Sequence, residues 1–400
     1  MKVGIVVPFS WSYLGGVGEH ADAQAAALEA LGVESLVICG DDPPGRPSRL
    51  LHPDAPRHDR RPSRVRSVGT TVTVSANGSR AHIVLSPLAV VRLRKLLDRE
   101  RFDLLHVHEP LTPALCVAAL ACARCPVVAT WHATGESRWM SIGATLWGHL
   151  LERVDHGIAV SQPARDSAVR YGSGACEIIP NGITIPERAE PGGRRNAVVY
   201  IGRNDPRKGL EVLLRAWPEV RRSTGARLRL IGAEPSSVRM LMTRKKLSDE
   251  GVDLLGVVVG APLTAELRAA KALAAPSLGR ESFGMALVRA FACATPVVAS
   301  NIPGYAGVMS PDVGTLVPPG DPAALAGALV ALLRDEPRRL ELGTAARARA
   351  VDEYSWDRLA RRLLAIYDRL TPATEMRGST LRPSPVRAAG QDPMDRQISC

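Results

Sequence analysis

The sequence predicts an α/β protein built from two doubly wound domains, and three observations lead to this fold class. The chain has 400 residues, which is more than one hydrophobic core usually holds. Hydrophobic residues make up 46% and charged residues 23%, as in soluble globular proteins. Short Val/Ile/Leu runs alternate with helical patterns along the chain, and such runs are typical of parallel strands covered on both faces.

Five apolar runs in each half of the chain predict ten strands. Helical patterns separate them, and strands alternating with helices form parallel sheets with crossover connections. The stretch "IIPNGITIP" at 178–186 interrupts the alternation with Pro-Asn-Gly. We therefore place one domain at 1–182 and a second at 183–354. The predicted strands are 2–8, 33–39, 102–108, 126–131 and 157–161, then 196–202, 226–232, 252–258, 272–276 and 296–300.

Three segments depart from this alternation. "SWDRLARRLLAIYDRL" at 355–370 has apolar residues at helical spacing and predicts a last amphipathic helix. Residues 371–400 have no periodicity and many Pro, Ser and Arg, so we predict a disordered tail. Residues 41–66 are rich in Pro, Arg and His and predict a mobile loop.

The charge of the chain limits its partners. A net charge of +11 and an isoelectric point of about 9.7 favour anionic partners: nucleic acid, phosphorylated small molecules or an anionic membrane. The alternative is that the arginine-rich composition of the whole chain accounts for this charge without an anionic partner. Aromatic residues make up only 4% and do not interleave with the basic residues, so we predict no nucleic-acid binding.

The cysteines indicate a reducing compartment. Seven cysteines in 400 residues do not make a disulfide framework, and several stand in apolar runs, as buried thiols do. Cys122 and Cys125 form a C-x-x-C, but no second pair completes a zinc site. "MKVGIVVPF" is too short for a signal peptide, and two prolines and an arginine break the longest apolar stretch, 111–131. We therefore expect a cytoplasmic protein.

Four segments at predicted strand ends carry candidate site residues, because ligands of open α/β sheets bind beyond the carboxyl ends of the strands. Gly15-Gly16 follows the first strand and opens a helix, where backbone N–H groups favour an anion. Glycine pairs are also common in ordinary turns. His132 directly follows a strand in "ATWHATGES", although a lone histidine is more often a structural residue.

The other two segments lie in the second half of the chain. In "GRNDPRKG", Arg203 and Lys208 flank a turn that leads into a helix, which suits a diphosphate site, and a solvated basic turn is the alternative. In "ESFG", the Glu281 carboxylate suits sugar hydroxyls, and the backbone N–H groups that follow suit an anion.

Together these motifs resemble the GT-B glycosyltransferases of family four, over about residues 1–370. Within that family the sequence is most similar to the actinobacterial phosphatidyl-myo-inositol alpha-mannosyltransferases, which share "GGV" followed by a histidine at the position of His20. The resemblance implies two Rossmann-like domains facing a cleft, with helix 355–370 returning to the first domain. The motifs are Gly15-Gly16, "HVHEP" (106–110), "ATWH", "IPNGI" (179–183), "GRNDPRKG" (202–209), "ESFG" (281–284) and "YSWDRLARRLL".

The resemblance also implies roles for these residues. His132 would contact the sugar near the reacting centre, Arg203 and Lys208 would neutralise the leaving diphosphate, and Glu281 would hold sugar hydroxyls. The residues implied in catalysis are His132, Arg203, Lys208 and Glu281, and those implied in binding the nucleotide-sugar are Gly15, Gly16, Arg203, Lys208, Glu281, Ser282, Phe283, Gly284 and Arg289.

The family transfers a hexose with retention from a nucleotide-sugar. The resemblance implies mannose from GDP-mannose, a phosphatidylinositol-type lipid acceptor at the cytoplasmic membrane face, and front-face attack in which the leaving phosphate receives the acceptor proton. The sequence contains no Asp-x-Asp, so we predict a metal-independent site without a cofactor. We also expect a monomer or weak oligomer.

A predicted basic helix at 88–101, "LAVVRLRKLLDRER", is relevant to membrane binding. Leucines and valines alternate there with basic residues, a pattern typical of helices that bind anionic lipid surfaces. The alternative is an ordinary helix packed on the sheet with a solvated basic face. The candidate membrane residues are Arg92, Arg94, Lys95 and Arg99.

Five positions depart from the family pattern. Arg289 stands where the family has a second glutamate that binds ribose, and a guanidinium cannot accept hydrogen bonds. Lys271 replaces an acidic residue and Ala294 a glycine in the same region, while Phe9 and Gly18 replace polar residues near the acceptor. Two alternatives therefore remain: a glycosyltransferase with a soluble acceptor and another GDP- or UDP-sugar, and a catalytically lapsed paralogue that binds a nucleotide or a membrane.

Overall fold

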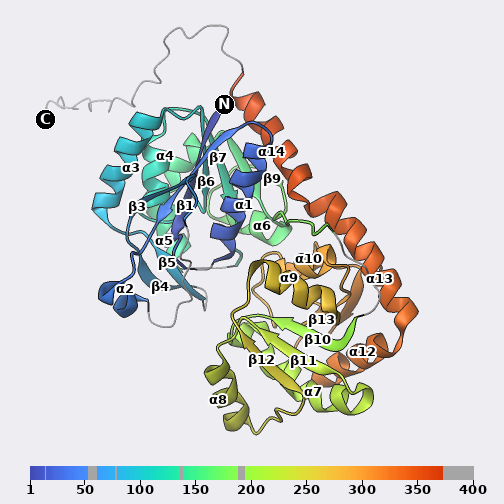
Figure 1. The fold of residues 1–400 in the computed structure, drawn as a ribbon. Helices are drawn as coiled ribbons and strands as arrows, with labels where there is room; N and C mark the ends of the chain where they lie inside the picture. The colour runs from blue at the N-terminus through green and yellow to red at the C-terminus, as the bar shows by residue number, and fades with distance from the viewer. Residues whose placement is uncertain (14, 53–60, 77–78, 136–137, 188–193, 373–400) are drawn as a thin grey trace, which may run out of the picture.

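A computed structural model describes residues 1–13, 15–52, 61–76, 79–135, 138–187 and 194–372. The predicted tail lies outside these residues from 373 onward, as does 53–60 of the predicted mobile loop. Two sheets with helices on both faces form two bodies, one above the other in Figure 1. All ten predicted strands are present in these sheets.

The first sheet has the order β3-β2-β1-β6-β7-β8-β9, and neighbouring strands along this path are parallel. The antiparallel pair β4–β5 joins it through β1. Its strands are β1 (Lys2–Ser10), β2 (Glu34–Gly40), β3 (Val65–Gly69), β4 (Val72–Ala76), β5 (Ser79–Ile83), β6 (Leu104–His108), β7 (Val127–Trp131), β8 (His156–Ala159) and β9 (Cys176–Ile178). Its helices are α1 (Gly16–Ala30), α2 (Arg46–Leu51), α3 (Pro87–Glu100), α4 (Leu115–Cys122), α5 (Arg138–Trp147), the short η1 (Gly148–Arg153) and α6 (Gln162–Arg170).

The second sheet is parallel throughout, in the order β12-β11-β10-β13-β14-β15. Its strands are β10 (Arg195–Ile201), β11 (Arg227–Ile231), β12 (Val252–Gly256), β13 (Ala270–Ala275), β14 (Val297–Ser300) and β15 (Gly314–Val317). The helices around it are η2 (Pro206–Lys208), α7 (Leu210–Thr224), α8 (Pro235–Lys245), α9 (Gly260–Ala269), α10 (Met285–Ala292), α11 (Pro303–Ala306), α12 (Pro322–Arg334) and α13 (Glu336–Arg349).

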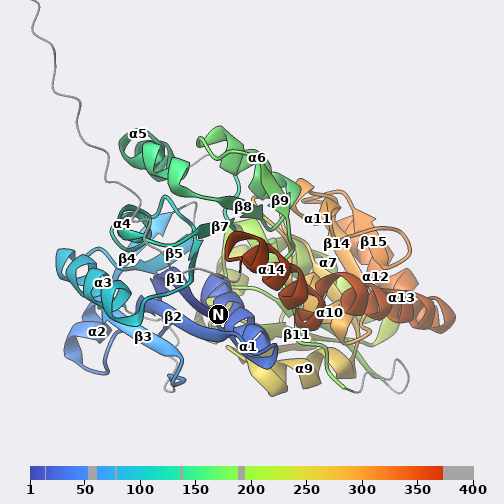
Figure 2. The same ribbon diagram turned by 90° about the horizontal axis from the view of Figure 1, so that it is seen from above.

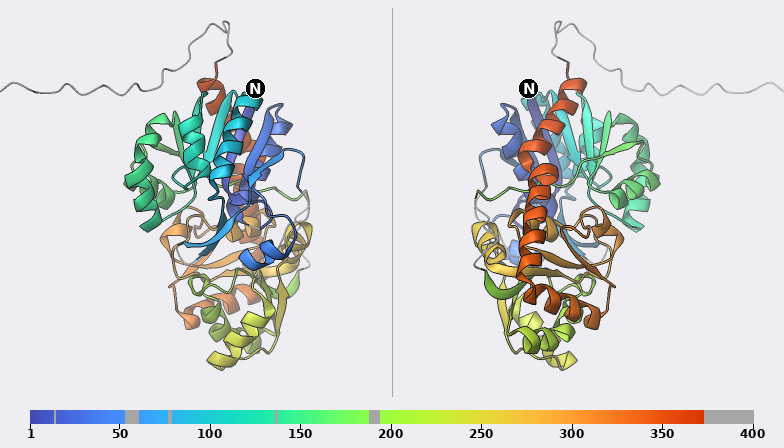
Figure 3. Two further views of the ribbon diagram at one scale, coloured as in Figure 1. Left: turned by 90° about the vertical axis from the view of Figure 1, so that its left-hand side faces the viewer. Right: turned by 90° about the vertical axis from the view of Figure 1, so that its right-hand side faces the viewer.

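The chain then returns to the first domain, as predicted. The π-helical turn η3 (Ala350–Tyr354) leads into α14 (Trp356–Leu370), which runs from the lower body to the upper one (Figure 3) and lies beside α1 (Figure 2). The apolar stripe of α14, which includes Trp356, Leu363 and Ile366, packs into the core formed by β1 and α1. The Tyr367 hydroxyl lies 2.5 Å from Nδ1 of His106 on β6, so the helix is tied to the sheet.

The interpretation of 41–66 as a mobile loop is wrong for the residues that the structure describes. That segment contains α2 and the start of β3, and the Asp42 carboxylate is buried. It lies 2.6 Å from the hydroxyls of Ser10 and of Thr71, each of which donates to it. The many Pro, Arg and His residues obscured a fixed polar network. Strands β9 and β15 were missed because three or four residues are too few to show a period.

Candidate active site

The end of the first sheet that faces the second domain is formed by adjacent strands β1, β6 and β7. The chain leaving β1 turns into α1, whose N-cap is Gly15. Gly15 and Gly16 are exposed, and a Cβ built on either would meet no described atom within 4 Å. Packing within the described chain therefore does not demand glycine at these positions. The bare backbone leaves room for the close approach of a ligand.

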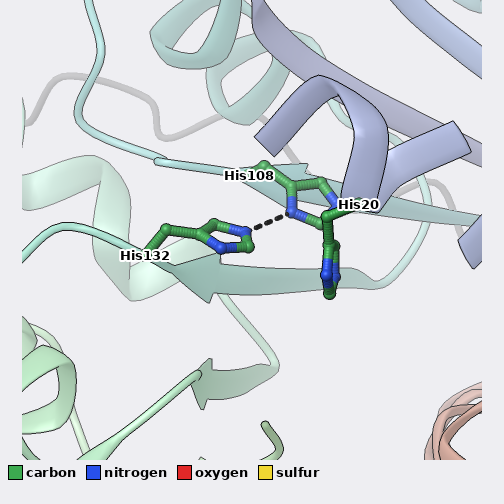
Figure 4. Close-up of side chains that lie close together, drawn as sticks. All are labelled: His20, His108 and His132. Atoms are coloured by element: carbon green, nitrogen blue, oxygen red, sulfur yellow. Dashed lines mark hydrogen bonds between the residues drawn. The ribbon is translucent and has the colours of Figure 1, made fainter. Parts of the chain in front are cut away.

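Three histidines converge at this end of the sheet (Figure 4): His20 on α1, His108 at the end of β6 and His132 just after β7. We call them the histidine cluster. Nδ1 of His108 and Nε2 of His132 are 2.8 Å apart, so one donates a hydrogen bond to the other. Burial lowers the pKa of His132 to about 4, and it lowers the pKa values of His20 and His108 well below their ordinary range. All three rings are therefore neutral at pH 7.

Glu109 fixes the backbone that carries His132. It has φ +56° and is buried directly after β6. Its Oε1 accepts hydrogen bonds from the backbone N–H groups of His132, at 2.8 Å, and Ala133, at 2.7 Å. Burial raises the pKa of Glu109 to about 7, while these two hydrogen bonds work in the opposite direction. Glu109 thus positions His132 through the main chain.

The second domain contributes a basic turn after β10. Arg203 is exposed in this turn, and Lys208 ends the short helix η2 within it. The next residue, Gly209, has φ +66°, and a Cβ there would lie 1.9 Å from the carbonyl oxygen of Pro276. Only glycine allows this approach. The basic turn is therefore held against the segment that follows β13.

Lys208 and Glu281 form an ion pair at the end of the second sheet. Lys208 Nζ lies 2.8 Å from Glu281 Oε1, with the two side chains 27% and 12% exposed. The backbone of Glu281 is tightly packed, because a Cβ on Gly304 would lie 1.9 Å from its carbonyl oxygen. The structure thus brings together two of the predicted site residues that are 73 positions apart in the numbering of the chain.

The rest of "ESFG" leads into α10. Gly284 has φ +95° and caps the helix, a conformation that favours glycine. Phe283 is buried, and its ring centroid lies 5.7 Å from that of Tyr354 in an edge-on contact. Its side chain therefore belongs to the core beside the domain connection, which leaves its backbone for a ligand. Ser282 is half-buried between Glu281 and Phe283.

Comparison with known proteins assigns the family. A model described as glycosyltransferase family 4 matches residues 14–185, and one described as glycosyl transferases group 1 matches 195–335. The phosphatidyl-myo-inositol mannosyltransferase of Mycobacterium leprae is 36% identical over 379 residues, covering 92% of this chain and 96% of that protein. The protein of the same name from Propionibacterium freudenreichii is 34% identical over 381 residues, covering 92% and 94%. The chain belongs to glycosyltransferase family 4.

A solved structure confirms the GT-B fold of this family. The Anabaena protein HepE in complex with UDP superimposes with a TM-score of 0.68 at 20% identity, covering 92% of this chain and 100% of that one. At this identity the likeness concerns the fold alone. Family membership confirms that the protein is a glycosyltransferase.

Arg289 is the main departure from the family pattern, and the structure shows what it contacts. Its Nη2 lies 2.5 Å from Oε2 of Glu19, in the first turn of α1. The two residues are 270 positions apart, and their contact joins the two domains. The predicted contact between Arg289 and the nucleotide-sugar remains a prediction, since here a carboxylate of the other domain engages the guanidinium.

The structure also places the other four departures from the family pattern. Ala294 is buried in the turn between α10 and β14 with φ +53°, a conformation in which glycine is favoured. Lys271 is half-buried on β13. Near the end of β1, Phe9 is half-buried and pairs with Ile83 of β5, and a Cβ on Gly18 would meet no described atom within 4 Å.

Three residues of this region were not assigned roles from the sequence. His108 and Glu109 lie in "HVHEP", which served only as a family motif, although an adjacent His-Glu pair at the end of an apolar strand is itself a signal. Glu19 carried no signal, because its partner is contributed by the other domain.

Proposed function

We propose that the protein transfers mannose from GDP-mannose to a phosphatidylinositol-type lipid at the cytoplasmic face of the membrane, with retention and without a metal ion. The names of the relatives support the sugar and the acceptor. One observation of the structure carries the proposal: the Lys208–Glu281 pair, at 2.8 Å, places a cation and a carboxylate side by side at the strand ends of the second domain. A diphosphate-sugar needs both, one for the phosphates and one for the sugar hydroxyls.

In the proposed reaction each of these residues has its own role. Lys208 and Arg203 neutralise the charge that develops on the diphosphate as the bond to the sugar breaks. Glu281 accepts hydrogen bonds from sugar hydroxyls and orients the ring. The neutral ring of His132 forms a hydrogen bond to the sugar without adding a charge. The acceptor hydroxyl attacks from the face that the diphosphate leaves, and its proton passes to the departing phosphate oxygen.

Helix α3 supports binding to an anionic membrane. Its inner face buries Ala89, Leu93 and Leu96. On the outside, Leu88 and Val91 are 55% and 50% exposed, and Arg92, Arg94, Lys95 and Arg99 are also exposed, although Arg99 pairs with Glu100. Apolar and basic groups on one surface suit a lipid headgroup region, at about 1 kcal/mol per well-placed cation. Among the described helices, none has the length and apolarity required to cross a bilayer.

The test combines donor and acceptor. Purified full-length protein is incubated with radiolabelled GDP-mannose and phosphatidylinositol vesicles, and labelled lipid is the expected product. Absence of label with this donor, together with label from a UDP-sugar or on a soluble acceptor, would overturn the proposal. Replacing Arg92, Arg94 and Lys95 with serine is expected to reduce transfer on vesicles, whereas transfer to lipid dispersed in detergent should persist.

A further inference from the structure

The histidine cluster is unusual because its members are buried and close together. His20, His108 and His132 are 8%, 0% and 8% exposed. One ring nitrogen from each lies within 4.8 Å of the corresponding nitrogen of the other two. The three rings come from α1, β6 and the segment after β7, so the cluster is held by different parts of the fold (Figure 4).

The hydrogen bonds among described residues do not satisfy these rings. Three neutral imidazoles carry three N–H groups and three lone pairs. The contact between His108 and His132 uses one of each. Nδ1 of His20 and Nε2 of His108 have no hydrogen-bond partner among the described residues. Buried polar atoms normally have partners, so the unpartnered Nδ1 of His20 indicates a missing occupant of the cluster, whereas Nε2 of His108 is the ring nitrogen that does not contact His132.

The chemistry of the rings selects the class of occupant. Neutral imidazoles suit Zn²⁺ and its neighbours in the first transition row, whereas Ca²⁺ and Mg²⁺ prefer oxygen ligands. Three histidines with a fourth position open to water are a recurrent zinc ligand set, with Zn–N distances of about 2.0–2.1 Å. Nitrogens around such an ion lie about 3.3 Å apart if the geometry is tetrahedral. The 2.8 Å separation of His108 and His132 requires a small opening, and the nitrogens of the cluster, which lie within 4.8 Å of one another, require His20 to adjust toward the other two rings.

We propose that His20, His108 and His132 form a binding site for a divalent transition-metal cation of the Zn²⁺ type. The ion replaces the hydrogen bond between His108 and His132, and each ring keeps its proton on the nitrogen that does not bind the metal.

The site has a consequence for transfer, which rests on the proposed function. His132 bound to a metal is fixed in the cluster and no longer free to meet the sugar. The cation is therefore an inhibitor of a reaction that itself needs no metal.

The first experiment measures binding without reference to activity. The metal-free full-length protein is titrated with Co²⁺, whose visible absorption becomes intense in a four-coordinate site, and with Zn²⁺ by calorimetry. We expect one Co²⁺ per chain with the intense band, and displacement by Zn²⁺. His20→Gln and His108→Gln should each weaken Zn²⁺ binding at least tenfold and remove the band. His149→Gln, in an exposed histidine of η1, is the matched control and should change neither.

Two further measurements keep the result interpretable. A Cys122→Ser/Cys125→Ser protein should bind Co²⁺ as the parent does, which excludes the thiols as ligands. If the histidine variants do not fold, anomalous diffraction from zinc-soaked crystals of the unmodified protein locates the ion. Intense Co²⁺ absorption that survives in folded His20→Gln and His108→Gln, or zinc located elsewhere, overturns the proposal.

Activity then separates the two proposals. With transfer established, Zn²⁺ should inhibit it and a chelator should restore it. Binding at the cluster without inhibition leaves the metal site standing and removes His132 from the proposed transfer reaction.

Discussion

The two sides of the interdomain site carry polar groups of opposite kinds. On the first domain, the histidine cluster is at most 8% exposed and its rings are neutral because burial disfavours their charged form. On the second domain, the side chains of Lys208, Glu281 and Arg289 are 27%, 12% and 24% exposed and carry charges within ion pairs. One side thus offers neutral hydrogen-bonding groups, and the other offers fixed charge.

This difference suits the two halves of a nucleotide-sugar. In the proposed function the anionic diphosphate gains most from the fixed cation of the second domain, the Glu281 carboxylate beside it accepts from sugar hydroxyls, and the neutral ring of His132 meets the sugar without adding charge. The two sides should therefore respond to different perturbations. Removing a cation acts on the second domain, and acid acts on the first.

Removing the Lys208 ammonium should have the largest effect. Lys208→Ala removes the cation proposed to neutralise the leaving diphosphate and leaves Glu281 without its partner, so kcat is expected to fall about a hundredfold or more. Transfer of labelled mannose to lipid measures it. Lys245→Ala is the matched control, because Lys245 pairs with Glu211 at 3.3 Å on the same domain. An equal fall of kcat in Lys208→Ala and Lys245→Ala would contradict the proposed role of Lys208 at the diphosphate.

Acid should act through the histidines. The folded protein holds the pKa of His132 at about 4 and that of His106 at about 3, and those of His20 and His108 are also lowered, from an ordinary value of 6.5. The unfolded chain therefore binds more protons below pH 6.5, so the stability these rings contribute is complete above pH 6.5 and lost as the pH falls toward 4. Urea denaturation between pH 7 and pH 5 should show a falling free energy of unfolding.

Ionisation of Glu109 changes the free energy of unfolding with pH in the opposite direction, so a variant at Glu109 is the control. Its pKa is raised from 4.5 to about 7, so its ionisation lowers stability as the pH rises through that range. Glu109→Gln removes this opposing slope and should make the loss of stability in acid steeper. A profile that is flat from pH 7 to pH 5 in both Glu109→Gln and the parent would show that the cluster is hydrated.

The sequence predicted each side of the site better than the contact between them. The strands that precede His132, Lys208 and Glu281 are β7, β10 and β13, whose short apolar runs are visible in the sequence, and parallel strands bring their carboxyl ends to one edge. The Lys208–Glu281 pair therefore follows from topology. The Arg289–Glu19 pair does not, because the periodicity of each half says nothing about how two domains face one another. The short strand β3 was missed because it begins within a segment rich in Pro, Arg and His, and β4 and β5, of five residues each, were also missed.

The contact between the domains can be tested by a double-mutant cycle. Arg289→Glu alone places two carboxylates together, so it should not strengthen GDP binding even though it restores the family residue. Arg289→Glu with Glu19→Gln removes the repulsion and should bind GDP more tightly than either single variant. The pair is only partly buried, so its coupling should be about 1 kcal/mol or less, up to about fivefold in Kd.

Calorimetry with GDP on the four proteins gives this coupling. The exchanged variant Glu19→Arg/Arg289→Glu keeps the pair with its charges reversed. It is the control for domain closure, which small-angle scattering measures. Tighter GDP binding by Arg289→Glu alone would mean that Glu19 and Arg289 are apart in the nucleotide-bound protein.

We expect the smallest effect, a change in stability, at Ala294 of the second domain. This alanine is held at φ +53° while the Arg194 guanidinium donates hydrogen bonds to its carbonyl oxygen, at 2.8 Å, and to that of Cys293, at 2.7 Å. A left-handed alanine costs about 1–2 kcal/mol, and glycine loses about 0.5–1 kcal/mol in backbone entropy on folding. Ala294→Gly should therefore stabilise the protein by about 1 kcal/mol or less, measured as a higher urea midpoint.

The exposed Lys246, at φ +54° after α8, offers a matched position, and Lys246→Gly should give a gain of similar size. If Ala294→Gly stabilises the protein and leaves kcat unchanged, Ala294 affects the folding of the second domain and not the transfer reaction. A loss of stability at Ala294 with a gain at Lys246 would instead mean that the buried methyl group packs well enough to outweigh its strain, since the two positions share a backbone conformation and differ in burial.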